Sequence, residues 1–295
     1  MVGRDLPARS AVAPSKDRAD SAKADRLAEA DGAKADRAAG LALTGLTRRP
    51  HFRDVTIAVN RGEIVGIFGL VGSGRSELLE TIFGLHRPDS GSIAIDGRAA
   101  HFASAREAVM AGVALVPEER QRQGLFFNLA LRPNLVLARS GLTGEWLVRE
   151  SAEHVETTRM LADWRIKAPD VDCLPDSLSG GNQQKLVVAK WLAVNPRLLL
   201  LDEPTKGVDV GAKFEIHEMI RRQAAGGLAV LVVSSDLPEV LAIADRIVVM
   251  KEGEIQGELA GAEATEQSVM HLATHPFDSP AGASAAGFAQ GRRRP

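Results

Sequence analysis

A glycine-rich loop between a buried strand and a helix is the feature that most constrains the fold of this chain. Residues 63–68 form a mostly apolar run, typical of strands that are covered on both faces. Gly69, Gly72 and Gly74 follow, and a helix is predicted over residues 75–84. In a loop of this kind the backbone N–H groups converge on one space, which suits a phosphate group. The sequence therefore predicts an α/β fold that binds phosphate.

The loop fits the P-loop template at every position but one. Ser76 is placed to ligate Mg²⁺. Arg75 stands where the template has lysine, and its guanidinium is a broad planar fork rather than a compact point charge. We therefore predict a site that holds nucleotide but turns it over poorly. The predicted phosphate contacts are Gly69, Gly72, Ser73, Gly74, Arg75 and Ser76.

Two carboxylates end a second buried strand, Leu198–Leu201. Asp202 would join Ser76 in the Mg²⁺ shell, as the acidic residue at such a strand end does in P-loop enzymes. Glu203 would act as the catalytic residue, polarising the attacking water as a general base. The alternatives are acidic residues that merely end a strand and glycines that merely make a turn. The two motifs together make both alternatives weak.

A second bare helix start follows the sequence Leu178-Ser179-Gly180-Gly181, ahead of a helix predicted over 182–194. Such an N-terminus favours an anion through its free N–H groups and its dipole. Beyond it, strands predicted at 198–202, 228–234 and 246–250 alternate with helices at 211–225 and 238–243. This alternation indicates a mainly parallel sheet.

Other segments complete the outline. Residues 52–59 alternate as a half-buried strand does, and residues 118–177 carry helical segments near 132–138 and 149–164 without strong strands. A last helix is predicted over 265–272. Residues 1–40 hold few large apolar side chains and are predicted to be a disordered or linker segment, and residues 275–295 a disordered tail.

Composition excludes several classes of function. A net charge of −2 and only nine Phe, three Trp and no Tyr argue against nucleic acid as a partner. The one cysteine, Cys173, forms no internal disulfide and no cysteine-based metal site. The seven histidines lack metal-ligand spacing and are predicted to lie on the surface. With neither a secretory signal nor a long apolar run, we expect a cytoplasmic protein whose membrane role comes through a partner.

In order and spacing, these motifs resemble the nucleotide-binding domain of ABC transporters over about residues 41–260. The resemblance implies a P-loop NTPase core with a mainly parallel sheet, an antiparallel β subdomain and a helical subdomain. The domain would span 41–274, with the helical subdomain at about 118–180. The sequences 178–185, 205–213 and 234–239 are similar to the second domain of the tandem ATPase subunit of bacterial sugar importers of the ribose, galactoside and xylose type.

The resemblance also implies partners and roles. Two such domains stack head to tail around ATP and Mg²⁺, so a second nucleotide-binding domain is expected, with Asp209 at the interface. Further expected partners are a membrane permease and, indirectly, a periplasmic sugar-binding protein. The chain would lie peripherally on the inner face of the cell membrane. Contacts to the partner domain's ATP would come from Ser179, Gly180, Gly181 and Gln183.

Three departures from the family pattern surround one site. Glu118 replaces the usual Q-loop glutamine, Ser235 replaces the switch histidine, and Arg75 replaces the lysine. They predict that this chain's own site is degenerate while its LSGG motif completes a partner's site. Residues 1–5 are similar to the linker between the two domains, so we expect a C-terminal half without its first domain.

Two alternatives stay open. The chain could be a non-catalytic nucleotide-binding module that assembles or regulates, which the three departures favour. It could instead be a soluble ABC ATPase of translation or DNA repair. The near-neutral charge and the lack of a long coiled coil or a basic arm count against the latter.

Overall fold

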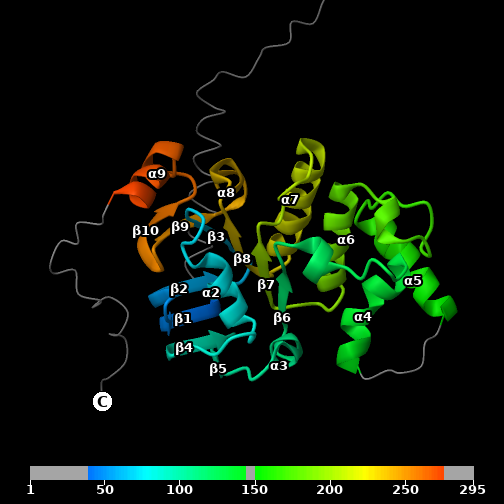
Figure 1. The fold of residues 1–295 in the computed structure, drawn as a ribbon, viewed down its shortest axis with the longest axis horizontal. Helices are drawn as coiled ribbons and strands as arrows, with labels where there is room; N and C mark the ends of the chain where they lie inside the picture. Colours follow the sequence, from blue (N-terminus) through cyan, green and yellow to red (C-terminus); the bar gives the residue numbers. More distant parts are fainter. Residues whose placement is uncertain (1–38, 144–149, 276–295) are drawn as a thin grey trace, which may run out of the picture. The chain divides into compact units, whose positions relative to one another are not determined.

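A six-stranded sheet forms the centre of the computed structural model, which describes residues 39–143 and 150–275 (Figure 1). Its strand order is β10–β9–β3–β8–β7–β6. Every neighbouring pair is parallel except β9 and β10. The mainly parallel sheet predicted from the sequence is therefore confirmed. The strands are β3 (Ile64–Phe68), β6 (Val113–Val116), β7 (Leu198–Asp202), β8 (Ala229–Ser234), β9 (Arg246–Lys251) and β10 (Glu254–Ala260).

A second, antiparallel sheet has the order β2–β1–β4–β5. Its strands are β1 (Ala39–Arg48), β2 (Phe52–Asn60), β4 (Ser90–Ile95) and β5 (Arg98–Ala100). In β2 the side chains of Phe52, Val55, Ile57 and Val59 are buried and all four residues between them are exposed. This alternation is the pattern predicted for residues 52–59, and the sheet is the antiparallel part that the family resemblance implied.

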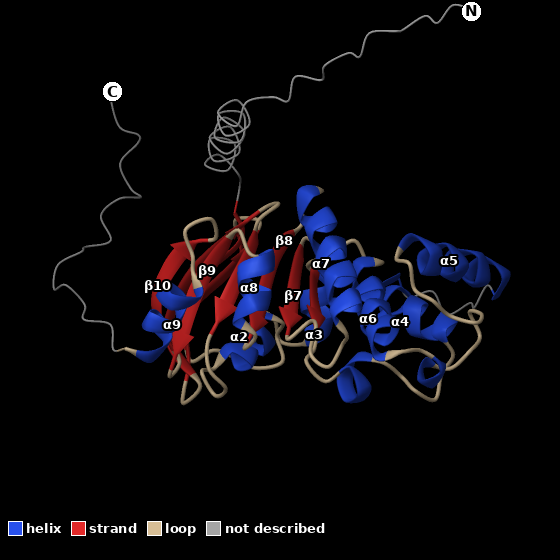
Figure 2. Cartoon of the chain, turned by 90° about the horizontal axis from the view of Figure 1, so that it is seen from above, coloured by secondary structure: helices blue, strands red, loops and turns tan. Residues whose placement is uncertain are grey.

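Helices cover the six-stranded sheet and extend beyond one end of it. Figure 2 shows α4, α5 and α6 gathered past the β7 side of the sheet. The helices are α2 (Arg75–Ile82), α3 (Ala105–Met110), α4 (Leu131–Thr143), α5 (Glu150–Asp163), α6 (Gly180–Leu192), α7 (Val210–Ala225), α8 (Leu237–Ile243) and α9 (Glu266–Thr274). A π-helical turn, η1 (Arg120–Gly124), lies between β6 and α4, and a 3₁₀ turn, η2 (Pro175–Ser177), lies between α5 and α6. A helical subdomain bounded at about 118–180 stays a prediction.

Capping residues explain where several helices begin. The side chains of Ser179, Asp209, Asp236 and Thr265 each accept a hydrogen bond from a backbone N–H in the first turn of the helix that follows. Such a cap satisfies one of the free donors of a helix N-terminus. The predicted helices 182–194, 211–225, 238–243 and 265–272 are thus present, each starting directly after its cap.

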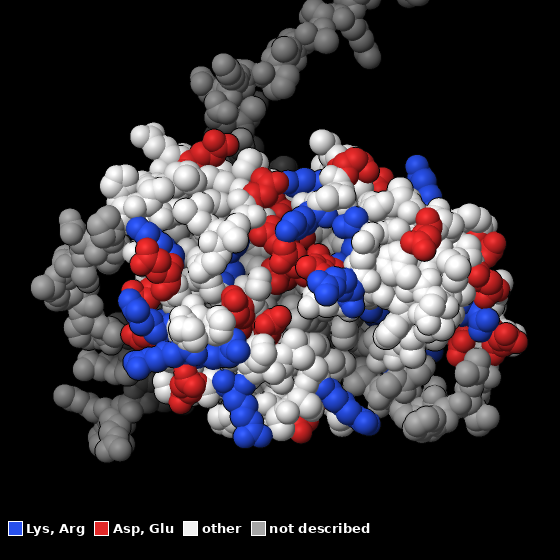
Figure 3. Space-filling model, in the orientation of Figure 1, with Lys and Arg blue, Asp and Glu red and all other residues white. Residues whose placement is uncertain are grey.

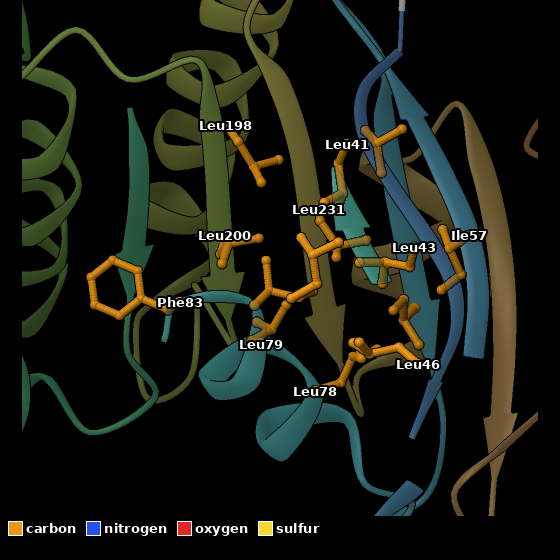
Figure 4. Packing of buried hydrophobic residues seen from close by; sticks show 14 of the residues in the cluster. Leu41, Leu43, Leu46, Ile57, Leu78, Leu79, Phe83, Leu198, Leu200 and Leu231 are labelled. Atoms are coloured by element: carbon orange, nitrogen blue, oxygen red, sulfur yellow. The ribbon is translucent and has the colours of Figure 1, made fainter. Parts of the chain in front are cut away.

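The leucines of β7 divide between two cores. Leu198 and Leu200 pack with the antiparallel sheet and α2, whereas Leu199 and Leu201 pack with the helices on the opposite face. Figure 4 shows the first core, where Leu78 and Leu79 of α2 lie between the two sheets. Full burial of such a side chain stabilises the fold by roughly 1.5–3 kcal/mol. The packing fixes the end of β7, and with it Asp202, beside the glycine-rich loop.

Two regions need a brief statement. Segments 1–38 and 276–295, where a linker and a tail are predicted, lie outside the described residues. Among the helices that the structure describes, none is both long enough and apolar enough to cross a lipid bilayer.

Candidate functional site

The glycine-rich loop leads from β3 into α2 as predicted, and its glycines sit where a side chain would not fit. A Cβ atom on Gly69 would lie 2.3 Å from the carbonyl oxygen of Met250, and one on Gly74 would lie 2.3 Å from that of His51. Gly74 also has a φ of 91°, in the left-handed region that favours glycine. The loop backbone is therefore held tightly against the β1–β2 turn and the end of β9.

Unpartnered polar atoms surround this loop. Within the described residues, Ser73 Oγ, Arg75 Nη1 and Asp202 Oδ1 are buried and have no hydrogen-bond partner. Four further unpaired atoms among the described residues, in Arg48, Thr157, Gln184 and Trp191, lie on other elements. Because buried polar atoms in proteins are nearly always paired, three such atoms at one loop and the adjoining strand end indicate a ligand-binding position. A hydroxyl and a guanidinium suit phosphate oxygens, and a carboxylate oxygen suits Mg²⁺. The loop at residues 69–76 and Asp202 at the end of β7, which together we call the nucleotide cradle, therefore fit a nucleotide phosphate with its metal ion.

Asp202 and Ser76 lie together at this cradle. The Ser76 side chain hydrogen-bonds the Asp202 carboxyl, which is 7% exposed. Burial raises the pKa of Asp202 to about 7, and the nearby Glu118 and Glu203 charges act in the same direction. A positive ion at this position would remove the penalty for the charged form. The two side chains are thus placed as the predicted Mg²⁺ ligands would need to be.

The raised pKa of Asp202 predicts a pH-dependent metal response. Mg²⁺ needs the ionised carboxylate, so protons compete with it as the pH falls through about 7. We expect the Mg²⁺-dependent part of ATP affinity to fall by up to about tenfold per pH unit below that point. Fluorescent-nucleotide titrations with and without Mg²⁺ would measure this. In Asp202→Asn only the slope due to the nucleotide's own phosphate should remain, and an unchanged slope would contradict the assignment.

Glu203 follows β7 with a φ of 47° and is held by three groups. Its Oε1 accepts a hydrogen bond from the backbone N–H of Ser235 at 2.7 Å, and its Oε2 lies 3.0 Å from Ser234 Oγ. Arg75 Nη2 lies 3.5 Å from Glu203 Oε1. Burial lowers the pKa of Arg75, although the Glu203 charge opposes that shift. Arg75, which stands where the P-loop template has lysine, therefore forms an ion pair with Glu203, the predicted general base.

Glu118 lies on the loop after β6 and forms an ion pair with Lys206. Two residues on, the Arg120 guanidinium donates to the carbonyl of Lys206 at 3.0 Å and to Gln183 Oε1 at 3.4 Å. Charged side chains of both signs also gather across the middle of the face shown in Figure 3. In the sequence, Arg120 belongs only to the short basic and polar run at 120–123. Its bridge between three distant segments has no signal in the local sequence.

The Leu178–Gly181 sequence forms the start of α6. Ser179 is exposed and caps the helix, while Gly181 packs so closely on α7 that an added Cβ would lie 2.3 Å from that of Ala212. Gln183 is buried, and its amide donates to the carbonyls of Pro175 and Leu178 at 3.1 and 3.2 Å. Gln183 therefore supports the loop, and its contact with a partner's nucleotide stays a prediction.

Asp209 and the histidines also have defined places. Asp209 is exposed and caps α7, accepting from the N–H of Ala212 at 2.9 Å. The prediction that the histidines lie on the surface is wrong for His217. This residue of α7 is buried beside Glu239 of α8. Its position three and seven residues before the buried Ile220 and Ala224 was a helical signal for burial. Ser235, at the switch position, is exposed.

The comparison with protein families decides what kind of protein carries this site. The family model described as ABC transporter matches residues 52–206. The chain belongs to the ABC transporter family. Solved ATP-binding cassettes share its fold: a dimeric, post-hydrolysis structure of MJ0796 bound to ADP and Pi has a TM-score of 0.66. It is 24% identical, and the similarity covers 75% of this chain and 98% of that one.

Curated relatives of this ABC cassette are longer. A ribose import ATP-binding protein, RbsA 2, of Streptomyces avermitilis is 45% identical over 240 residues, which are 79% of this chain and 46% of the relative. A putative ribose/galactose/methyl galactoside import ATP-binding protein of Geobacillus kaustophilus is 43% identical, again over 79% of this chain and 47% of the relative. The chain thus spans about half the length of the curated relatives it matches.

Proposed function

We propose that the chain is the ATP-binding, energy-coupling C-terminal half of a bacterial sugar importer. The names of its relatives, which are ribose and galactoside import ATP-binding proteins, support the substrate class. That the chain matches about half of each relative supports a second nucleotide-binding domain as its partner. A membrane permease and, indirectly, a periplasmic sugar-binding protein would complete the system. The chain would then work at the cytoplasmic face of the membrane.

One observation carries this proposal: a second glycine-led helix, α6, begins at an exposed serine, Ser179. Ser179 is exposed at the N-terminus of α6, and α6 packs against α4 and α7. The phosphate loop instead opens α2, which packs against β7. A helix N-terminus that faces outward is suited to a phosphate that another domain holds. Ser179, Gly180, Gly181 and Gln183 would complete the partner's ATP site, with Asp209 at the interface.

The geometry of the chain's own site supports slow turnover. ATP and Mg²⁺ would be held by the loop from Gly69 to Ser76 and by Asp202. Glu203 would orient the attacking water, but its carboxylate already faces Arg75, accepts a hydrogen bond from the Ser235 N–H and lies against the Ser234 hydroxyl. A carboxylate at Glu118 adds repulsion toward phosphate, which its ion pair with Lys206 reduces. We propose that this site binds ATP and closes the two-domain sandwich, while most hydrolysis occurs at the partner's site.

A second candidate function rests on the same contacts. If Arg75 stays on Glu203 when nucleotide is bound, the chain is a non-catalytic module that senses ATP and only assembles or regulates. This second function differs from the proposed one in that Ser179 would also serve no partner site. Turnover by the two-domain pair distinguishes this function from the proposed one.

The experiment pairs this chain with the half of the Streptomyces avermitilis relative that it does not match. We expect steady-state ATP turnover by the mixture to exceed the sum of the separate halves by about tenfold or more, because each composite site needs both domains. Brisk turnover by this chain alone would contradict the degenerate site. A mixture no faster than the sum, although the halves bind each other, would contradict the completion of a partner site.

A further inference from the structure

A buried polar cluster lies directly behind Glu203, outside the nucleotide cradle. Its members, Thr205, His217, Ser234 and Glu239, are each at most 7% exposed. They come from four segments: the loop after β7, helix α7, the end of β8 and helix α8. We call them the Glu239 cluster. A carboxylate so deeply buried is costly unless it is fully hydrogen-bonded, so the arrangement of its partners is informative.

Both oxygens of Glu239 are engaged. Its Oε1 accepts a hydrogen bond from Thr205 Oγ1 at 2.5 Å and lies 3.1 Å from His217 Nε2. Its Oε2 accepts from Ser234 Oγ at 2.7 Å. Burial by itself raises the pKa of Glu239, but the bonds from His217, Thr205 and Ser234 outweigh it and the net pKa is lowered. Glu239 is therefore an ionised acceptor, fixed on three sides.

Ser234 connects this cluster to Glu203. Its Oγ lies 3.0 Å from Glu203 Oε2 and also accepts a hydrogen bond from the N–H of Asp236 at 3.1 Å. A serine hydroxyl has a single proton and a free rotor, so two carboxylates compete for it. Glu239 lies closer to the Ser234 hydroxyl than Glu203 does, and its own position is fixed by other hydrogen bonds. Glu239 therefore sets the orientation of the hydroxyl that Glu203 contacts.

We propose that Glu239 is a positioning residue for Glu203, acting through the Ser234 hydroxyl, and that Thr205 and His217 hold Glu239 in place. The inference rests on the proposed function only in taking Glu203 as the group that faces the attacking water. Among the described residues, the side-chain hydrogen bonds of Glu239 go to Thr205, His217 and Ser234, and none goes to the loop at 69–76 or to Asp202. The hydrolysis step should therefore depend on it, and nucleotide binding should not.

Two variants test this in the full chain, paired with the half of the Streptomyces avermitilis relative that it does not match. The phosphate loop of that half is disabled, so that only the site containing Glu203 can turn over. Glu239→Leu removes the carboxylate, and Ser234→Ala removes one oxygen and is the milder change. We expect each to lower the single-turnover rate constant for MgATP hydrolysis about tenfold, about 1.4 kcal/mol in activation free energy. The Kd for a fluorescent ATP analogue should stay within about twofold. Ser234→Thr keeps the hydroxyl and should keep the rate. Glu218→Gln, an exposed change on α7, is the matched control.

The double variant decides whether the two residues act as one unit. If Glu239 acts through Ser234, Glu239→Leu/Ser234→Ala should lose about tenfold in total, whereas independent effects would multiply to about a hundredfold. Multiplying losses, or unchanged rates in the single variants, would overturn the proposal. So would a crystal structure of Ser234→Ala in which Glu203 keeps its bond to the Ser235 N–H. A wild-type chain that binds no MgATP would instead contradict the proposed function.

Discussion

Replacing Ser179 with arginine is expected to lower ATP turnover by the two-domain pair about a hundredfold or more. Ser179 is exposed, and its hydroxyl caps α6 by accepting a hydrogen bond from the N–H of Asn182. An arginine side chain would remove the cap, place positive charge at the positive end of the helix dipole and fill the space where phosphate would bind. Loss of one preorganised donor to a developing anion commonly costs 10²–10³ in rate.

The design separates this effect from folding and from the chain's own site. ATP turnover by the mixture would be measured with wild-type and variant chain at matched concentration, together with the Kd for MgATP of the isolated chain. That Kd should not change, because Ser179 belongs to α6 and the phosphate loop to α2. Ser151→Arg, an exposed serine on α5, provides a matched control for the added charge. Undiminished turnover in Ser179→Arg would show that this serine completes no partner site.

Local patterns were sufficient wherever the structure is set by neighbours in the sequence. The turn from β3 into α2 needs glycine at Gly74, whose φ is positive and whose missing Cβ makes room for the backbone at His51. The β7 leucines alternate between two cores, so a continuous apolar run could indicate a strand covered on both faces. The helices were predicted to within two residues of their starts, and the caps at Ser179, Asp209, Asp236 and Thr265 fix where each one begins.

Strands at irregular or polar edges gave no such signal. β1 was not predicted, because its pairing with β2 and β4 shifts register and its burial does not alternate. β10 is the edge strand of the larger sheet, and its residues, including Glu254 and Glu258, are only partly buried or exposed. Pairing with β9 makes it a strand, and the partner lies outside any short window of its own sequence.

The candidate site shows the same division. Asp202 and Glu203 were found because they end an apolar run, and Ser76 because it follows the glycines at a fixed spacing. The contacts of Glu203 with Ser234 and of Arg120 with Gln183 join residues 31 and 63 positions apart. No periodicity links such pairs. Ser235 stands where the family pattern has the switch histidine. The three-dimensional arrangement shows that it contributes its backbone N–H, rather than its side chain, to Glu203.

The close packing of α6 on α7 gives a second prediction, on stability. An added Cβ at Gly181 would lie 2.3 Å from the Cβ of Ala212, well inside the distance that carbon atoms tolerate. Gly181→Ala should therefore lower the free energy of unfolding by about 2 kcal/mol, within the usual range for overpacking. Alanine's better helix propensity, worth about 1 kcal/mol, opposes this loss but is smaller than the clash it must offset. Urea unfolding followed by circular dichroism would measure the difference.

The reciprocal change tests the cause. In Gly181→Ala/Ala212→Gly the methyl group moves from one helix to the other, so the clash is removed and most of the lost stability should return. Ala212→Gly alone should cost only about 1 kcal/mol, the helix propensity of glycine. A double variant as unstable as the sum of the two single variants would mean that the helices do not meet at these residues. Recovery would instead show that the contact of Gly181 with Ala212, three residues after Asp209, holds the Ser179 end of α6 against α7.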